Sequence, residues 1–338
     1  MSKSIFEIDQ NMLNNTYESS IEDDVCYYNL NNDYILGQAF RNNFKRLPDD
    51  VFVSENVEAL KKHPAGENII FKTNSKNIKL KAKLAGAAYM SHMTAVGTIG
   101  FSLYVLNKNK WVYLGCSKVN KSEYSVNLIT GMDNEERTYR IYFPLYQELQ
   151  EAYVGVDANS KFFFLKPKME NIVIYGTSIS QGGCATRPGM DYGAILGRML
   201  NANVINLGFS GSCKIEPEMT QILNRIEKKC LILEVEANSP SCEHMQEHLT
   251  YMLENLENKD KFDIYLISHF SEGAMLVNKK AKQARKKFKE LQESLPYVNF
   301  VDGEKIIKDL EYEGTVDGVH LTDLGFYHLA KKLAKIIK

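Results

Sequence analysis

The stretch "ENIVIYGTSISQGG", residues 170–183, decides the fold, because an apolar run there ends on Gly176 and small polar residues follow. Successive apolar residues without alternation are typical of a strand buried on both faces, as in a parallel sheet. The polar part predicts a turn into a helix, with Ser178 two residues past the end of the strand. Such a turn can bind a phosphate, present a nucleophile or only cap the helix.

Four more short apolar runs follow this strand, with helical periodicity between them. They are "NVINLG" (203–208), "CLILEVEAN" (230–238), "FDIYLIS" (262–268) and "YVNFVDG" (297–303). Residues 192–200 carry apolar side chains at i, i+3, i+4, i+7 and i+8, which is typical of a helix with one buried face. Five strands alternating with helices predict a parallel sheet covered on both faces. Functional residues of such sheets lie outside the carboxyl ends of the strands.

The first half of the chain has a different period. Residues 68–84, 100–115 and 137–145 alternate between apolar and polar side chains, and each of the first two stretches predicts a hairpin of two strands around a polar turn. This pattern predicts an all-β sandwich. A chain of 338 residues is long enough for two domains. We therefore expect a sandwich domain over residues 1–165 and an α/β domain over residues 166–338, which starts with the linker sequence "KPK".

The composition excludes several classes of protein. The formal net charge is −1, so no basic excess indicates a nucleic-acid partner. No apolar stretch is long enough to span a bilayer, and the first residues lack the apolar core of a signal peptide. Six cysteines without a CxxC pair indicate reduced thiols in a cytoplasmic protein, with no disulfide framework. We expect no cofactor, no metal and no membrane partner, and the sequence leaves the oligomeric state, including a homo-oligomer, open.

Ser178 does not belong to the common motifs of a strand-to-helix turn. The phosphate loop needs a Lys after its last Gly, and the dinucleotide pattern G-x-G-x-x-G is absent. The α/β-hydrolase pattern G-x-S-x-G fits as far as Ser178 but then has Ser180 in place of Gly. Taken alone, Ser178 is more often a helix cap than a nucleophile.

The other strand ends carry residues that would suit a nucleophilic serine. Gly208 follows the second strand, where a backbone N–H could face an oxyanion, although a Gly-rich turn is also ordinary. Asn238 follows the third strand. In the last loop Asp317 lies three residues before His320, a spacing that lets the carboxylate accept the imidazole N–H and fix its tautomer.

This ordered set resembles the SGNH (GDSL-type) hydrolases, whose sequence blocks carry Ser, Gly, Asn and His in this order. The stretches "YGTSISQGGCATRPGMDYGAILGR" (175–198), "INLGFSGS" (205–212) and "TVDGVHLTDLGF" (315–326) are similar to the blocks of a two-domain branch, and "GFSLY" (100–104) is similar to its G-x-D-L-Y motif. The resemblance extends from about residue 30 to the end. It implies a flavodoxin-like three-layer α/β/α domain with a five-stranded parallel sheet, preceded by an all-β jelly-roll-like sandwich.

Three positions depart from the family pattern. Thr177 stands where the family usually has Asp, a change that this branch commonly shows. In the third block Glu234 stands where the family usually has Asp, and Ala237 stands where a hydrophobic residue or Pro usually precedes the Asn, here Asn238. In "GFSLY" Ser102 stands where Asp is typical, so the role of that Asp does not carry over.

The resemblance implies roles for the residues at the strand ends. Ser178 would be the nucleophile and His320 its general base, oriented by Asp317. The oxyanion hole would consist of the N–H groups of Ser178 and Gly208 and the side-chain amide of Asn238. No metal would take part in the reaction.

The function implied is a serine esterase that hydrolyses an acyl ester through an acyl-enzyme, with acetyl esters of carbohydrates as the preferred substrates. Arg187 and Gln181 are candidates for contacting the substrate, although "RPG" at Arg187 also indicates a fixed turn. An acyltransferase using the same acyl-enzyme, or a carbohydrate-binding protein with a weak or inactive hydrolase domain, are the alternatives. The acyl chain length and the alcohol are not readable from the sequence.

Residues 244–248 offer an alternative interpretation, a zinc site in place of an ordinary helix. "HMQEH" (244–248) fits the H-x-x-E-H pattern, with His244 and His248 one helical turn apart. A third ligand is missing, and Met245 and Leu249 continue an apolar stripe. We therefore expect an ordinary helix that packs through this stripe.

Overall fold

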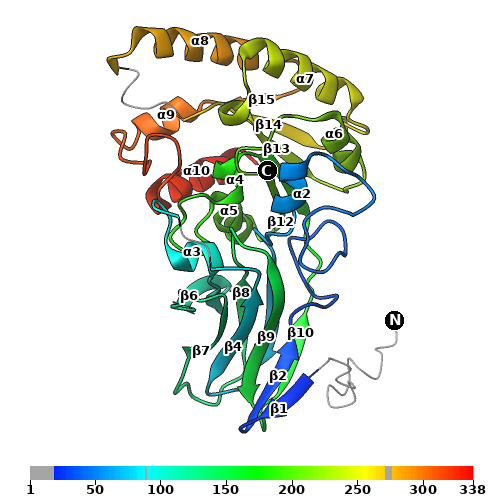
Figure 1. Cartoon of the computed structure of the whole chain (residues 1–338), viewed down its shortest axis with the longest axis vertical. Coiled ribbons are helices and arrows are strands. Elements are labelled where there is room, and N and C mark those ends of the chain that lie inside the picture. The colour runs from blue at the N-terminus through cyan, green and yellow to red at the C-terminus, as the bar shows by residue number, and fades with distance from the viewer. Residues whose placement is uncertain (1–18, 88–89, 271–275, 338) are drawn as a thin grey trace.

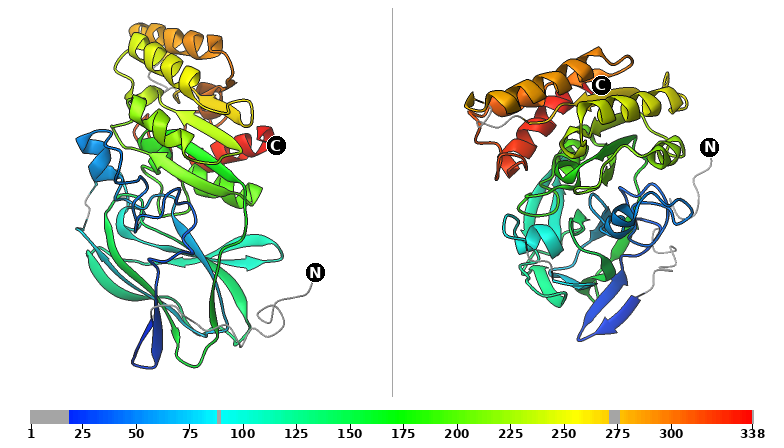
Figure 2. Two further views of the ribbon diagram at one scale, coloured as in Figure 1. Left: turned by 90° about the vertical axis from the view of Figure 1, so that its right-hand side faces the viewer. Right: turned by 45° about the horizontal axis from the view of Figure 1, so that its top comes forward.

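The computed structural model describes residues 19–87, 90–270 and 276–337. Two antiparallel sheets form a β-sandwich, and a parallel sheet with its helices lies beyond them along the longest axis of the molecule (Figure 1). Figure 2 shows the same end-to-end arrangement from two further sides. Among the described residues, no helix is both long and apolar enough to cross a membrane.

The sandwich consists of two five-stranded sheets. The strands of the first, in spatial order, are β1 (Ser19–Glu22), β2 (Val25–Asn29), β9 (Leu149–Asp157), β4 (Ile78–Leu84) and β7 (Glu123–Ile129). The strands of the second are β10 (Phe162–Leu165), β3 (Asn68–Thr73), β8 (Arg137–Tyr142), β5 (Ser102–Asn107) and β6 (Lys110–Cys116). Alternate residues of the strands other than β1, which is exposed along its length, point into one apolar core between the sheets.

The predicted strands of the sandwich are present, but one connection differs from a hairpin. The hairpin expected over residues 100–115 is confirmed, because β5 and β6 pair antiparallel. In contrast, β3 and β4 flank a polar turn and belong to opposite sheets, β3 pairing with β8 and β4 with β9. The two strands predicted over residues 68–84 are confirmed, but the predicted hairpin between them is wrong, because an alternating pattern does not say which strands pair.

The parallel sheet has the spatial order β12-β11-β13-β14-β15, which is the 2-1-3-4-5 order of flavodoxin-like sheets. Its strands are β11 (Asn171–Gly176), β12 (Asn203–Gly208), β13 (Cys230–Glu234), β14 (Asp263–Ile267) and β15 (Asn299–Val301). The helices of this domain are α4 (Ser178–Gln181), α5 (Tyr192–Leu200), α6 (Pro217–Asn224), α7 (Cys242–Asn255), α8 (Lys279–Ser294), α9 (Gly303–Lys308) and α10 (Asp323–Ile336). A 3₁₀ turn covers Glu236–Asn238.

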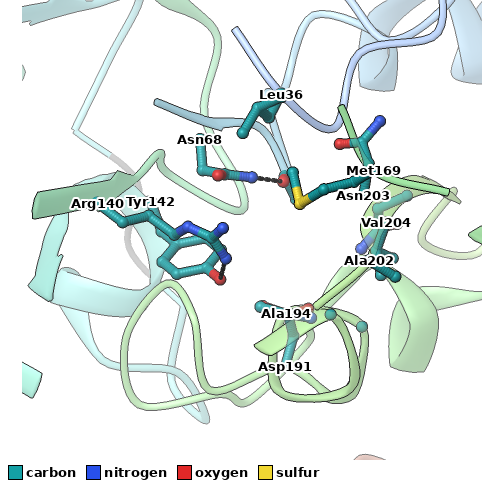
Figure 3. A pocket seen from close by; sticks show the side chains of 14 residues that line it. Leu36, Asn68, Arg140, Tyr142, Met169, Asp191, Ala194, Ala202, Asn203 and Val204 are labelled. Carbon is teal, nitrogen blue, oxygen red and sulfur yellow. Dashed lines mark hydrogen bonds between the residues drawn. The ribbon is translucent and has the colours of Figure 1, made fainter. Parts of the chain in front are cut away.

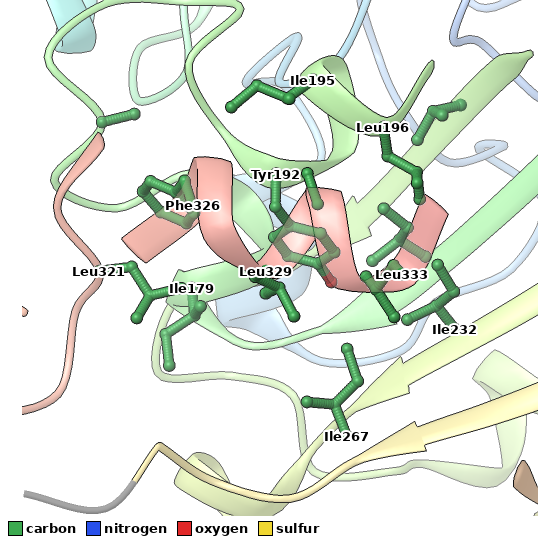
Figure 4. Close-up of a cluster of buried hydrophobic side chains, with 14 of the residues drawn as sticks. Ile179, Tyr192, Ile195, Leu196, Ile232, Ile267, Leu321, Phe326, Leu329 and Leu333 are labelled. Carbon is green, nitrogen blue, oxygen red and sulfur yellow. The ribbon is translucent and has the colours of Figure 1, made fainter. Parts of the chain in front are cut away.

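Helices cover both faces of the parallel sheet, as predicted. Helices α5 and α10 lie on one face, where Phe326, Leu329 and Leu333 of α10 pack with Tyr192 and with Ile232 of the sheet (Figure 4). Helices α6 and α7 cover the opposite face in a second apolar core. Burial of each such side chain contributes about 1.5–3 kcal/mol, so the sheet gives a rigid platform for its strand ends.

The first half of the chain also packs against this platform. Val57 of helix α2 (Glu55–Leu60) is buried in the core formed with α6 and α7, and Leu47 joins it there. Ala65 and Tyr146 are buried in the core on the other face. The segment between β2 and β3 therefore reaches from the sandwich to the strand ends of the parallel sheet.

A small cavity lies between the sandwich and the parallel sheet (Figure 3). Asn68, Arg140 and Tyr142 line it from the sandwich, and Asp191 and Ala194 line it from the other domain. Its volume is about 10 Å³, which is room for roughly one water molecule. This cavity is too small for a substrate.

Candidate active site

Ser178 lies at the first position of α4, directly beyond β11, and is 7% exposed. Its Oγ is 2.8 Å from Nε2 of His320, and Nδ1 of the same ring is 2.7 Å from Oδ2 of Asp317. The three side chains come from two strand-end loops that are 142 residues apart in the sequence. The structure thus places them in one continuous chain of hydrogen bonds.

The loop before α10 fixes the carboxylate of this chain. Oδ1 of Asp317 accepts hydrogen bonds from the backbone N–H groups of Val319 at 3.0 Å and His320 at 2.8 Å. Partial burial opposes the charge of Asp317, but the hydrogen bonds from His320 and Val319 outweigh it and lower the pKa to about 2. The carboxylate therefore stays ionised at neutral pH and holds the His320 ring with Nε2 toward Ser178.

The buried carboxyl group of Glu234 forms hydrogen bonds with the turn that carries Ser178. Oε2 of Glu234 accepts hydrogen bonds from Thr177 Oγ1 at 2.7 Å and from Ser180 Oγ at 3.0 Å. Burial raises the pKa of Glu234 to about 7, although these hydrogen bonds oppose the shift. Ser180 also contacts the hydroxyl of Tyr192 at 2.8 Å. Ser180, which breaks the G-x-S-x-G pattern, is thus buried and bonded to Glu234 and Tyr192. It takes no part in the contact between Ser178 and His320.

The structure does not support the prediction that the Gly208 N–H is an oxyanion donor. Its N–H already donates to Oδ1 of Asn206 at 2.9 Å. A Cβ at Gly208 would lie 2.2 Å from the backbone nitrogen of Gln181, so this glycine serves the close approach of α4 to β12. Gly211 in the same loop has φ +67°, and a Cβ there would meet nothing within 4 Å. Within the part of the chain that the structure describes, no acceptor is found for the N–H of Gly211 or of Ser178.

Asn238 ends the 3₁₀ turn that follows β13. Its side-chain oxygen accepts a hydrogen bond from the backbone N–H of Cys213 at 3.4 Å. Its backbone oxygen accepts one from Nζ of Lys214 at 2.6 Å. These contacts bind Asn238 to the loop that follows Gly211 and direct the NH₂ end of the amide away from Cys213.

The two candidates for substrate contact, Gln181 and Arg187, both have partners within the protein. Gln181 is fully buried, its Nε2 donates to the Leu145 carbonyl oxygen at 3.0 Å, and its Oε1 accepts from the Ser210 N–H at 2.9 Å. Arg187 donates to the Tyr104 hydroxyl at 2.6 Å and lies 3.6 Å from the centre of the Tyr113 ring. Gln181 is therefore a brace between loops. Arg187 joins the turn after α4 to the sandwich.

Sequence reasoning missed Arg46, a fully buried residue of the first half of the chain. Its Nη1 donates to the carbonyl oxygens of Asn206 at 3.2 Å and Gly208 at 2.6 Å, and its guanidinium lies 4.6 Å from the centre of the Phe209 ring. Burial lowers the pKa of Arg46 to about 10, while the nearby Glu67 opposes the shift. Arg46 remains charged at neutral pH and holds the end of β12, from which the Gly211 loop starts. A lone Arg in an irregular segment gives no sequence signal for such a contact.

Cys184 is a second nucleophilic side chain near the site. Burial and then the charge of Asp317 raise the pKa of its thiol to about 12. The thiolate is the reactive form of cysteine. Cys184 therefore stays protonated at neutral pH and does not rival Ser178 as a nucleophile.

The zinc reading of residues 244–248 finds no third ligand among the described residues. The rings of His244 and His248 stack with centroids 4.0 Å apart on α7, and Nδ1 of His248 lies 3.1 Å from the carbonyl oxygen of Ile215. The group of three potential ligands found in the described chain lies elsewhere. Met245 and Leu249 are fully buried, as the helical reading predicts.

Two family models match this chain, one for each of its two domains. Residues 169–338 match the model of the GDSL-like lipase/acylhydrolase family, and residues 25–162 match the model of the GxDLY N-terminal domain of SGNH-hydrolase-type esterases. A protein from Bacteroides ovatus described as a GDSL-like lipase is 29% identical, with a TM-score of 0.85 over 92% of this chain and 98% of that chain. Among proteins with curated functions, no sequence matches.

Two more distant solved structures share the two-domain fold. A salicylyl-acyltransferase from a tetracycline biosynthetic pathway has a TM-score of 0.68 at 13% identity, over 93% of this chain and 94% of that chain. An active-site mutant of a family two carbohydrate esterase from Clostridium thermocellum has a TM-score of 0.56 at 13% identity, over 81% of this chain and 94% of that chain.

Proposed function

The chain belongs to the GDSL-like lipase/acylhydrolase family, and we propose that it is a serine esterase whose nucleophile is Ser178. The observation that carries this proposal is the hydrogen-bonded chain Ser178–His320–Asp317, with contacts of 2.8 and 2.7 Å. Nucleophile, base and orienting carboxylate within hydrogen-bond reach are the arrangement that activates a serine hydroxyl.

The reaction proceeds in two steps. Oγ of Ser178 attacks the ester carbonyl carbon while its proton passes to Nε2 of His320, and Asp317 stabilises the imidazolium. The tetrahedral intermediate collapses when His320 returns the proton to the leaving alcohol, which leaves an acyl group on Ser178. Water then attacks the acyl-enzyme with His320 again acting as base, and the acid and free Ser178 are released.

Three donors are assigned to the oxyanion of the tetrahedral intermediate. They are the N–H of Ser178, the N–H of Gly211 in place of the predicted Gly208, and the side-chain amide of Asn238. The support for Gly211 is that its N–H has no acceptor in the described chain and that the space beside it is open. Removal of one such donor lowers kcat by about 10²–10³.

We assign acetyl esters of carbohydrates as the substrate class. The strand orders β2-β9-β4-β7 and β3-β8-β5-β6 support a jelly-roll assignment, a fold that also occurs in lectins. Carbohydrate esterases are among the proteins that share the two-domain fold, and one of them was solved with cellohexaose. A cavity of about 250 Å³ lies at the same sheet edge, and its lining includes Ser268, His269 and charged side chains of α8 that can form hydrogen bonds with a sugar.

The test is pre-steady-state kinetics with an activated acetyl ester. Wild type should release one equivalent of the alcohol in a burst, because the acyl-enzyme forms before it is hydrolysed. Ser178→Ala should lose the burst and at least about 10⁴-fold in kcat. Ser294→Ala, which removes the hydroxyl of an exposed helix end, is the matched control and should keep both.

The substrate class is tested separately with a series of esters of increasing acyl length and with acetylated sugars. Acetyl esters and acetylated sugars should be cleaved best. A preference for long acyl chains would exclude the carbohydrate assignment, and transfer of the acetyl group to an added alcohol faster than to water would favour an acyltransferase. Equal slow hydrolysis by wild type and Ser178→Ala would overturn the esterase proposal itself.

A further inference from the structure

A cluster of metal-binding side chains shares His320 with the catalytic chain. One ring nitrogen of His92, the sulfur of Cys184 and one ring nitrogen of His320 all lie within 4.8 Å of one another. The rings of His92 and His320 have centroids 5.4 Å apart. The reaction proposed above uses neither His92 nor Cys184.

The cluster is built from both halves of the chain. His92 lies in the loop between β4 and helix α3 (Ala95–Ile99), and Cys184 lies just after α4. The two loops are joined by a hydrogen bond of 2.5 Å from the Thr94 hydroxyl to the Thr186 carbonyl oxygen. Cys184 has φ +73°, a left-handed conformation that is uncommon for a residue other than glycine. This turn places the thiol within 4.8 Å of a ring nitrogen of His92 and of His320.

The donor set has the chemistry of a zinc site. A thiolate and two imidazoles are preferred ligands of Zn²⁺ and leave the fourth tetrahedral position for another ligand. Asp317 accepts the Nδ1–H of His320, which leaves Nε2 as the nitrogen available to a metal. A carboxylate behind a ligating histidine is the usual support of a zinc–histidine bond.

We infer that His92, Cys184 and His320 form an inhibitory site for a thiophilic divalent cation such as Zn²⁺. Binding replaces the proton of Cys184 by a sulfur–metal bond and releases that proton to solvent. The metal occupies the Nε2 lone pair of His320 that otherwise accepts the proton of Ser178, so the base is lost while the ion is bound. The inhibitory effect rests on the proposed function, whereas the binding of the ion does not.

Binding is measured first and without activity. Co²⁺ replaces Zn²⁺ as a spectroscopic probe, because its bond to a thiolate gives a charge-transfer band in the near ultraviolet. Wild type should show this band at one equivalent of Co²⁺, and added Zn²⁺ should displace it. Cys184→Ser should lose the band, and Cys116→Ser, which removes a half-buried thiol outside the cluster, should keep it.

Inhibition is measured next as the Zn²⁺ concentration that halves turnover of an acetyl ester. His92→Ala and Cys184→Ser should keep the metal-free turnover and raise this concentration at least about tenfold. Mg²⁺, which prefers oxygen ligands, should not inhibit at the same concentrations. A chelator should restore the activity of wild type.

Equal sensitivity of wild type and both variants to Zn²⁺ would overturn the proposal, because it would mean that His320 alone binds the ion. Absence of the Co²⁺ band in wild type would overturn it as well. A Co²⁺ band that depends on Cys184 in a protein without any esterase activity would support the metal site and contradict the proposed function.

Discussion

Two arginines join the halves of this molecule in different ways. Arg46 comes from the first half, is 1% exposed and donates to main-chain oxygens at the end of β12. Arg187 comes from the second half, is half-buried and contacts the Tyr104 hydroxyl and the face of the Tyr113 ring. The first contact fixes backbone beside the proposed oxyanion loop, and the second fixes side chains on the sandwich.

The Arg46 contact therefore couples the first half of the chain to the proposed active site more strongly than the Arg187 contact does. Removal of Arg46 leaves carbonyl oxygens without a donor in a buried place, which costs the full desolvation of those groups. It also removes the positive charge that opposes the rise of the Glu67 pKa, so this carboxyl group stays protonated in the folded protein. Removal of Arg187 leaves the buried Tyr104 hydroxyl with a contact of 3.4 Å to the Gly189 carbonyl oxygen, and the Tyr113 ring is already 39% exposed.

The largest effect is expected for Arg46→Met. The variant should lose about 3–5 kcal/mol of unfolding free energy, because the buried carbonyl oxygens of Asn206 and Gly208 lose their charged donor. The folded fraction should also lose kcat with KM nearly unchanged, because the β12 end that leads to Gly211 is no longer held. Chemical denaturation and steady-state kinetics measure the two effects.

Arg46→Lys is the matched variant for this prediction, since it keeps the charge but cannot donate to two carbonyl oxygens from a planar fork. It should recover part of the stability and little of kcat. An Arg46→Met protein that folds and keeps wild-type kcat would show that the contact has no part in positioning the site.

The second prediction concerns the pH dependence of stability near Arg46. Burial raises the pKa of Glu67 to about 8 in the folded protein, so the folded state keeps this proton at a pH where the unfolded state has lost it. The unfolding free energy should therefore fall as the pH rises toward 8, by at most about 1.4 kcal/mol per pH unit from this group. Glu67→Gln, which cannot ionise, should flatten this slope when unfolding is measured from pH 6.5 to 9.

Glu234 contributes to the same slope in the same direction, because burial raises its pKa to about 7. Comparison of Glu67→Gln with wild type isolates the share of Glu67. An unchanged slope in this variant would mean that Glu67 is not the group that titrates.

A smaller effect is expected for Arg187→Ala. The loss of the stacked and hydrogen-bonded guanidinium should cost about 1 kcal/mol of stability. Because Arg187 is assigned to the interface with the sandwich, kcat should stay within about threefold of wild type. A drop of kcat by more than tenfold, with KM for small acetyl esters increased, would return Arg187 to the substrate contacts.

The smallest effect is the pairwise coupling between Arg187 and Tyr113. A double-mutant cycle with Arg187→Ala and Tyr113→Leu should give an interaction energy of about 0.5–1 kcal/mol for the guanidinium over the ring. A coupling near zero would assign the stability of this contact to the Tyr104 hydroxyl instead.

Periodicity predicts the elements of this chain well, because it reports which face of each element is buried. The five strands of the parallel sheet and the helices on both faces follow from it, and so does the hairpin of β5 and β6. It does not predict pairing between distant strands, so the crossing from β3 to β4 between the two sheets is visible only in the structure.

The candidate site shows the same limit. The spacing of Asp317 and His320 predicts their hydrogen bond, because both lie in one short loop. The sequence does not show whether Gly208 or Gly211 of the "INLGFSGS" turn offers its N–H to the oxyanion. Only the packing shows that backbone atoms of α4 lie where a side chain of Gly208 would be. Arg46 lies 162 residues from Gly208 in the sequence, and no local sequence pattern predicts a contact over that separation.

If Ser178 is the nucleophile, it carries the acyl group during turnover. The most direct measurement is peptide mapping by mass spectrometry of the protein quenched in acid during the burst with an activated acetyl ester. One acetyl group is expected on Ser178, located within its peptide by fragmentation, and none is expected in Ser178→Ala. An acetyl group on Cys184 in its place, or continued turnover with no acyl group on Ser178, would mean that Ser178 is not the nucleophile.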